Sequence, residues 1–192
     1  MTKPNYFSEN RPYPGEPRSG DLTFFKEIHS QFFLGICDVT GHGYKAHQLA
    51  NTINIFLDHC SSVDTRTIMS QLNESLVSTI GAASSFTIID KETGKGEFSG
   101  IGNVGSFLFG SKETCFPLTD GVLGHFKRSF KSYPFKMQKG DKLVFCSDGI
   151  SSRFYSTVNR NIMSASNDII VKTIMRDFSK SHDDASCLVF EY

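Results

Sequence analysis

Four short acidic segments, far apart in the chain, each lie at or beside an apolar run that is typical of a strand. A carboxylate next to a buried strand loses hydration, and that loss is costly unless a positive charge replaces the water. None of the four segments contains Lys or Arg, although Arg18 and Lys45 closely flank two of them. Hard divalent cations bind carboxylate, carbonyl and water oxygens, so the pattern predicts a metal site that folding assembles. The segments are residues 19–21 (Ser-Gly-Asp), 38–43 (Asp-Val-Thr-Gly-His-Gly), 147–149 (Ser-Asp-Gly) and 182–185 (His-Asp-Asp-Ala).

The segment 38–43 is the most distinctive of the four. Asp38 ends a predicted buried strand, and Gly41 and Gly43 allow a tight turn into a helix that begins near residue 44. A close approach of the backbone would let the Val39 carbonyl join Asp38 on a metal ion. The free N–H groups at the start of the new helix favour phosphate, which makes the two glycines candidate substrate contacts. The alternative is a structural strand–turn–helix corner in which Asp38 is the helix cap.

The other three segments each have an ordinary structural explanation when taken alone. A strand that ends in Asp148-Gly149 is usually followed by a turn, and Gly-Asp before a strand, as at Asp21, is commonplace. Adjacent like charges at Asp183 and Asp184 are unfavourable unless they are solvated or metal-bound. The joint occurrence of four acids at strand edges in one small domain is what favours the metal site.

Three further motifs lack the context that their chemistry requires. Residues 100–105 match Gly-x-Gly-x-x-Gly, but a predicted strand follows them where a dinucleotide site needs a helix. Ser147 lacks the glycine two positions earlier that a nucleophile elbow needs. His42 and His47 are five residues apart and cannot share a helical face as zinc ligands do. For His42, a solvated turn residue and a general acid are the two interpretations.

One basic cluster occupies a predicted loop between strands. It is interpreted either as a solvated hairpin or as a contact to substrate phosphate or to an acidic partner surface, with Arg128 as the candidate residue. The cluster consists of His125, Lys127, Arg128 and Lys131.

The elements that must position these acids alternate between strands and helices. Helices are predicted where apolar residues recur every three or four positions, in one case after a cap at Asp64. The first 18 residues contain four of the six prolines, which disfavours helix but allows short edge strands such as 6–8. The order predicts a layered α+β architecture, with sheets inside and helices outside, as a single domain over residues 1–192. Predicted strands are 22–28, 31–39, 85–90, 96–101, 106–109, 114–118, 142–146 and 185–192, and predicted helices are 46–60, 68–80 and 167–178.

The composition argues against several classes of function. Lys and Arg together number 20, as do Asp and Glu, and the zero net charge argues against broad nucleic-acid or anionic-membrane binding. The five cysteines are scattered with no Cys-x-x-Cys pair, which is typical of a reducing compartment. The start of the chain does not look like a signal peptide, and no apolar run approaches the ~18 residues of a membrane span. We therefore expect a cytoplasmic protein.

Taken in order, the acidic segments resemble those of the bacterial metal-dependent serine/threonine phosphatases of the PP2C superfamily, in the branch typified by SpoIIE. There a Gly-Asp strand, an Asp-x-x-Gly-x-Gly corner, an Asp-Gly after a late strand and an Asp-Asp near the C terminus build the metal centre. The resemblance covers about residues 19–192 and implies an α-β-β-α sandwich of antiparallel sheets flanked by helices.

The resemblance also implies a site and a chemistry. The implied ligands are Asp21, Asp38 with the Val39 carbonyl, Asp148 and Asp183, of which Asp38 and Asp148 form the catalytic core. Asp183 is preferred to Asp184 because the first acid of the pair usually has that role. The implied reaction is hydrolysis of phosphoserine or phosphothreonine by direct attack of a water that bridges two Mn²⁺ or Mg²⁺ ions, with a third ion possible.

Two glycine-containing segments, residues 102–105 (Gly-Asn-Val-Gly) and 121–124 (Gly-Val-Leu-Gly), look like those of the small RsbX-type stressosome phosphatases. That likeness implies phosphorylated STAS-domain scaffold or antagonist proteins as substrates and partners. The chain departs from the pattern at residues 22–25 (Leu-Thr-Phe-Phe), where many relatives carry another acid, and at 103–106 (Asn-Val-Gly-Ser), where many have Asn-Ala-Gly-His.

Two alternative functions are compatible with the acids. A PP2C-fold module that is weakly active or inactive could dock phosphorylated partner-switching proteins without hydrolysing them. A metal nuclease has similar carboxylates but requires a basic surface for DNA or RNA, which this composition does not supply.

Overall fold

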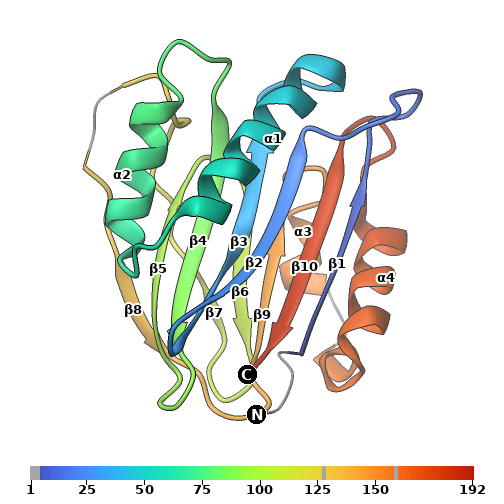
Figure 1. Cartoon of the computed structure of the whole chain (residues 1–192). Helices are drawn as coiled ribbons and strands as arrows, with labels where there is room; N and C mark the ends of the chain where they lie inside the picture. Colours follow the sequence, from blue (N-terminus) through green and yellow to red (C-terminus); the bar gives the residue numbers. More distant parts are fainter. Residues whose placement is uncertain (1–4, 127–128, 158–159) are drawn as a thin grey trace.

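Two antiparallel sheets packed face to face form the centre of the computed structural model, which describes residues 5–126, 129–157 and 160–192 (Figure 1). The strands of the first sheet are, in order, β1 (Asn5–Arg11), β10 (Ala185–Glu191), β9 (Lys142–Cys146), β6 (Gly105–Phe109) and β7 (Thr114–Cys115). Those of the second sheet are β2 (Asp21–Ile28), β3 (Gln31–Val39), β4 (Ala82–Asp90), β5 (Lys95–Ile101) and β8 (Tyr133–Lys136).

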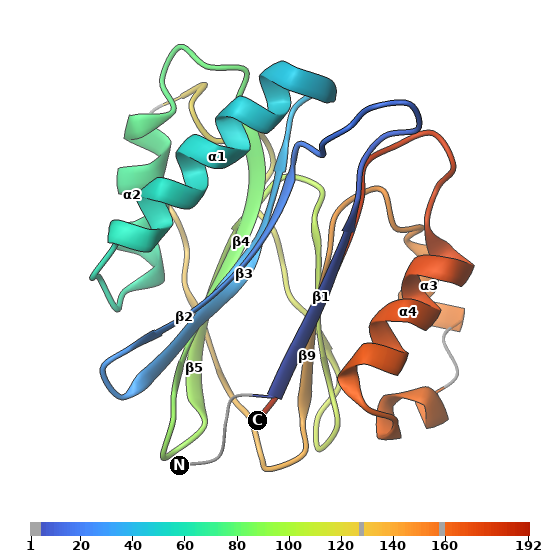
Figure 2. The same ribbon diagram turned by 45° about the vertical axis from the view of Figure 1, so that its right-hand side comes forward.

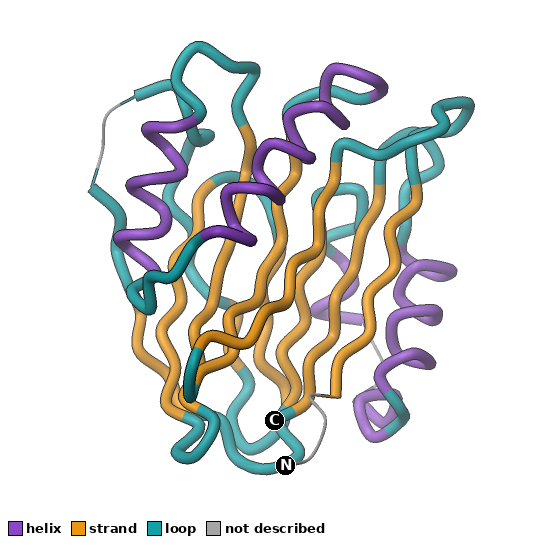
Figure 3. Tube along the Cα trace, in the orientation of Figure 1, coloured by secondary structure: helices purple, strands orange, loops and turns teal. Residues whose placement is uncertain are grey.

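Helices cover the outer face of each sheet, so the molecule has four layers (Figures 2 and 3). The second sheet is covered by α1 (Gly43–His59) and α2 (Thr65–Ser75), and the first by α3 (Arg153–Thr157) and α4 (Asn167–Phe178). A short 3₁₀ helix, η1 (Arg160–Ser164), precedes α4. This arrangement confirms the predicted α-β-β-α sandwich. Within the described ranges, every helix is too short or too polar to cross a membrane.

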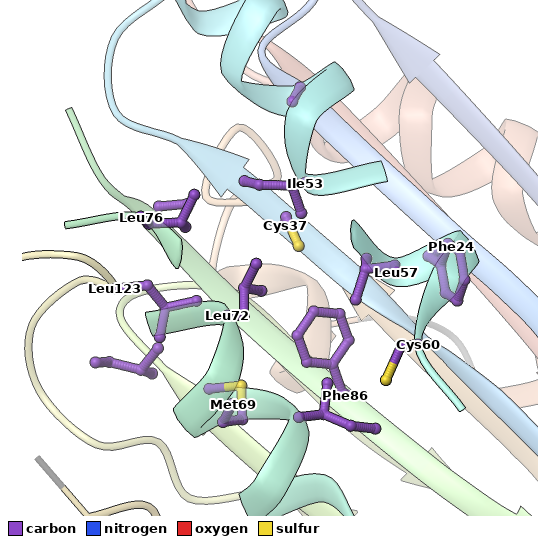
Figure 4. Close-up of a cluster of buried hydrophobic side chains, with 14 of the residues drawn as sticks. Phe24, Cys37, Ile53, Leu57, Cys60, Met69, Leu72, Leu76, Phe86 and Leu123 are labelled. Carbon is purple, nitrogen blue, oxygen red and sulfur yellow. The ribbon is translucent and has the colours of Figure 1, made fainter. Parts of the chain in front are cut away.

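Alternating side-chain directions along each strand divide the apolar core into layers. In β3, Phe33 and Cys37 pack under α1 and α2, whereas Leu34 and Ile36 face the space between the sheets. Figure 4 shows the first of these layers, where strand residues such as Phe86 meet side chains from both helices. A fully buried Leu or Ile contributes roughly 1.5–3 kcal/mol, so these layers fix which face of each strand points inward.

Two predicted elements are shorter in the structure, and one strand was not predicted. Helix α2 ends at Ser75 instead of continuing to residue 80, and the Thr79 hydroxyl donates to the Leu76 carbonyl just beyond its end (2.6 Å). The strand predicted at 114–118 is only two residues long, because Pro117 has no N–H for a ladder. Pro134 lies in β8, an unpredicted strand, which tolerates proline because it forms the edge of its sheet.

Other elements were not predicted or were predicted only in part. Strand β1 is seven residues long and pairs with β10, which extends the edge strand suggested at residues 6–8. The helices α3 and η1 have five residues each, too few for a helical periodicity to be seen in the sequence. The cap predicted for the second helix is confirmed, since Asp64 accepts a hydrogen bond from the Arg66 N–H (3.2 Å).

Candidate metal centre

Strand alternation brings Asp21 and Asp38 to one end of the space between the sheets. Asp21 begins β2 and lies directly opposite Asp38 of β3 in the antiparallel register. In β3, positions 34 and 36 face the opposing sheet, so the period of two directs Asp38 to the same side. The start of β2 and the end of β3 lie at the upper end of the sandwich in Figure 1, so the two carboxylates continue the inter-sheet core at that end.

The other sheet supplies the remaining acids at the same end. Asp148 follows β9 and Asp183 precedes β10, and these two strands are antiparallel neighbours, with Cys146 opposite Cys187. The end of one strand therefore meets the start of the other. Gly149 makes this junction possible, because a Cβ at that position would overlap the carbonyl oxygen of Asp184.

Asp21 is a buried acid whose charge is poorly compensated. One carboxylate oxygen, Oδ2, has no hydrogen-bond partner among the described residues. Burial, followed by the charges of Asp184 and Asp148, raises the pKa of Asp21 to about 7, although the hydroxyls of Ser147 and Ser186 lower it in part. A buried carboxylate in this condition is stabilised by a nearby cation.

Asp38 and Asp183 belong to the same electrostatic cluster. Burial and then the charges of Asp21 and Asp148 raise the pKa of Asp38 to about 8, although the nearby Asp148 backbone N–H lowers it in part. Burial and then the charge of Asp148 also raise the pKa of Asp183. Four acids from two sheets therefore repel one another across a single region.

This donor set fits hard divalent cations. Within the described part of the chain, no three His, Cys, Asp or Glu side chains are close enough to enclose an ion on their own. Mg²⁺ is usually held by only one or two carboxylates, and waters complete its octahedron. The unpartnered Oδ2 of Asp21 and the mutual repulsion of the acids are the observations that favour cations. The Val39 carbonyl, at the end of β3, stays a predicted ligand.

The two adjacent acids before β10 have different surroundings. The Asp184 carboxylate is buried and accepts the backbone N–H groups of Tyr13 (2.6 Å) and Gly20 (3.0 Å). It thereby fixes the segment that leads into β2. Asp183 is less buried, and its side chain lies within hydrogen-bonding reach of Asp148. The bonds of Asp184 thus give it a structural role and leave Asp183 as the better candidate ligand.

The corner after Asp38 has the backbone that the sequence predicts. Gly41 (φ 85°) and Gly43 (φ 75°) both adopt the left-handed conformation that glycine favours, and α1 begins at Gly43. The His42 ring stacks on Tyr13, with centroids 4.2 Å apart, and its Nδ1 lies 3.5 Å from Glu16. These contacts favour a packed turn residue, and substrate binding by the two glycines stays a prediction.

The basic loop is described only in part. Lys127 and the predicted substrate contact, Arg128, lie outside the described residues.

His47, which the sequence analysis excluded as a zinc ligand, lies beside the acidic residues, and its Nδ1 is 3.1 Å from the Ser19 carbonyl oxygen.

Sequence reasoning gave no role to two polar residues near the acids. The Asn103 amide donates to Asp148 Oδ2 (2.5 Å), and the Asn10 amide donates to the backbone carbonyl of Asp21 (2.7 Å). Asn103 lies in a Gly-Asn-Val-Gly segment that was noted for its resemblance alone, so that segment was the available signal. Asn10 has no motif around it, because only the pairing of β1 with β10 brings it near β2.

Comparison with known families gives one match. The model of the family described as stage II sporulation protein E (SpoIIE) matches residues 29–192. This range includes Asp38, Asp148 and Asp183 but begins after Asp21. No curated protein sequence matches the chain.

Solved structures share the fold at low sequence identity. A chain from the bacterial stressosome superposes with a TM-score of 0.90 at 21% identity, covering 99% of this chain and 100% of that one. RsbX in complex with magnesium gives 0.84 at 19% identity, with coverage of 97% and 94%. The PP2C phosphatase domain of SpoIIE from Bacillus subtilis gives 0.76 at 18% identity, with coverage of 100% and 64%.

Proposed function

The chain belongs to the SpoIIE family of PP2C-type phosphatases, and on this basis we propose that it hydrolyses phosphoserine or phosphothreonine on bacterial stress-signalling proteins. The observation that carries the proposal is the convergence of Asp21, Asp38, Asp148 and Asp183 from two sheets at one end of the sandwich. In a protein of this family, acids that repel one another in a partly buried region support a metal-dependent reaction.

We propose that Asp21, Asp38 with the Val39 carbonyl, Asp148 and Asp183 hold two Mn²⁺ or Mg²⁺ ions, with a third possible. Such ions supply Lewis acidity, which lowers the pKa of water and neutralises the oxygens of a phosphoryl group. RsbX, which has the same fold, was solved in complex with magnesium.

The chain's own residues position and charge this site. The Asp148 backbone N–H favours the ionised form of Asp38, and the Asn103 amide donates a hydrogen bond that orients the carboxylate of Asp148. In the proposed reaction, water attacks phosphorus directly. None of these acids therefore forms a phosphoenzyme.

We further propose phosphorylated STAS-domain proteins of a stressosome-type pathway as substrates, with residues 1–192 acting as one catalytic domain in the cytoplasm. The likeness to a stressosome chain and to RsbX supports this choice of substrate class.

The test is phosphate release from a phosphorylated STAS-domain protein and from p-nitrophenyl phosphate, with Mn²⁺, with Mg²⁺ and with EDTA. We expect turnover of both substrates with either metal and none with EDTA. Binding of the phosphorylated protein without phosphate release, in any metal, would instead identify a non-catalytic docking module. Turnover that is unchanged in EDTA would contradict the assignment of a metal centre.

A further inference from the structure

A groove of about 550 Å³ opens directly beside Asp148. Asn103 and Asp148 line one part of it, and Phe107 and Tyr155 line another. The rings of Phe107 and Tyr155 are stacked, with centroids 4.8 Å apart and planes 16° apart, so this wall is firm and apolar. A peptide segment next to a phosphorylated side chain has a matching mixture of apolar and polar surface.

Lys180 is the one cation among the described residues that line this groove. Its backbone is held firmly, because its N–H donates to the Gly149 carbonyl (2.8 Å) and its own carbonyl accepts from the Arg11 guanidinium. Arg11 also donates to Ser179 Oγ (2.8 Å). Strand β1 and the turn after Asp148 therefore fix the backbone position from which the ammonium group extends.

The Lys180 side chain is half-buried and close to the acidic centre. It lines the same groove as Asp148. No salt bridge within 4 Å involves Lys180 in the described part of the chain. An ammonium group that lies beside acids but forms no salt bridge with them is available to bind an incoming anion.

We propose that the groove holds the peptide segment that carries the phosphorylated residue, and that Lys180 contacts an anionic oxygen of its phosphoryl group. This inference rests on the proposed phosphatase function. It specifies the side of the acidic site on which the substrate binds. The ligand is a phosphopeptide, and Lys180 is the residue that discriminates phosphorylated from unphosphorylated chains.

A kinetic experiment tests the contact with Lys180. We expect Lys180→Gln to lower kcat/KM by about 10-fold or more for a phosphoserine peptide and for p-nitrophenyl phosphate, because each substrate carries the phosphoryl group. Lys180→Arg should recover part of the loss. Lys112→Gln is the matched control, since Lys112 is an exposed lysine beyond β6 at the opposite end of the sheet.

Affinity labelling tests the groove without relying on turnover. Cys115 lines the groove and is exposed, whereas the other four cysteines are buried. A peptide with a bromoacetyl group next to a phosphonomethyl analogue of phosphoserine would alkylate the Cys115 sulfur, forming a thioether and releasing bromide. We expect this peptide to label Cys115 faster than its serine counterpart, and Lys180→Gln, but not Lys112→Gln, to remove the difference.

The two experiments separate the inference from the proposed function. Metal-dependent turnover with equal labelling by the two peptides, or with unchanged kinetics in Lys180→Gln, would overturn the groove assignment alone. Phosphonate-dependent labelling in a chain that never releases phosphate would contradict the phosphatase function and keep the groove.

Discussion

Asp21 and Asp141 are both buried aspartates, but they lie at opposite ends of the sandwich and have opposite surroundings. Both oxygens of Asp141 have donors: Ser111 N–H and Oγ–H (2.7 Å each) and Gln138 N–H (2.8 Å). Asp21 keeps one oxygen without a partner among the described residues, and burial first of all raises its pKa to about 7.

The comparison separates a structural acid from a functional one by hydrogen-bond satisfaction, since burial is the same for both. A satisfied carboxylate stabilises the fold, as Asp141 does when it joins the Ser111 turn to the start of β9. A carboxylate that lacks hydrogen-bond donors and lies close to other acids lowers the stability of the fold. Binding of a cation would explain why such an acid is present.

The largest effect is expected for Asp148→Asn. Loss of one core charge should lower metal-dependent turnover by about 100-fold or more, while circular dichroism shows an intact fold. Asp177→Asn, at an exposed acid on α4, is the control and should keep full activity. Near-normal turnover of Asp148→Asn would remove Asp148 from the proposed site.

The metal-free protein should lose stability as the pH rises. The pKa values of Asp21 and Asp38 in the folded state, about 7 and 8, lie above the ordinary aspartate value of 3.8. The folded chain therefore holds more protons than the unfolded chain across this window. The stabilisation is complete below about pH 4 and is lost as the pH rises through 7–8, and because one pKa unit corresponds to about 1.4 kcal/mol the loss amounts to several kcal/mol.

Urea unfolding in EDTA at pH 5.5 and pH 8.5 measures this loss. Asp21→Asn should flatten the dependence, because it removes one of the two titrating acids. Mn²⁺ should stabilise the chain more at pH 8.5, since ligands must be deprotonated to bind it. A metal-free protein that is more stable at pH 8.5 than at pH 5.5 would contradict this account.

The two buried aspartates should respond oppositely to the same substitution. We expect Asp141→Asn to destabilise the fold by about 1–3 kcal/mol, because a charged acceptor of three hydrogen bonds is lost. Asp21→Asn should leave metal-free stability at pH 8 unchanged or raised, because it removes repulsion. Equal destabilisation by both, measured in EDTA, would show that hydrogen-bond satisfaction does not distinguish them.

The smallest effect is expected for Asn103→Ala. Asn103 orients Asp148 through one hydrogen bond, so its loss should weaken apparent metal affinity by about 10-fold and leave stability nearly unchanged. Titration of activity against Mn²⁺ concentration measures this shift, and saturating metal should restore most of the turnover. A loss that no metal concentration reverses would assign Asn103 a different role.

Strands that are covered on both faces were the easiest elements to predict from the sequence. Nearly continuous apolar runs indicate β3 and β9, because burial on two faces leaves little choice of residue. Strand β8 escaped prediction because an edge strand is held by one neighbour and carries little pattern. Helix α3 escaped because five residues are less than two helical turns.

The candidate site was predictable only as far as its motifs reach. Asp38 and Asp148 each follow an apolar strand and are followed by glycine within a few residues, so the sequence singles them out. The hydrogen bonds of Asp184 and the position of Lys180 depend on contacts with residues 11–20, more than 160 residues away in the chain. No local pattern encodes such contacts, and for that reason the two adjacent acids could not be told apart by spacing alone.

Gly149 connects the turn that carries Asp148 to the segment that carries Asp183, because any side chain there would displace the Asp184 backbone. A single uncharged substitution at this position would therefore disturb both loops at once while every acid remained in the sequence. The acids of this chain are therefore not sufficient for the proposed site, because their placement depends on an uncharged residue that binds nothing itself.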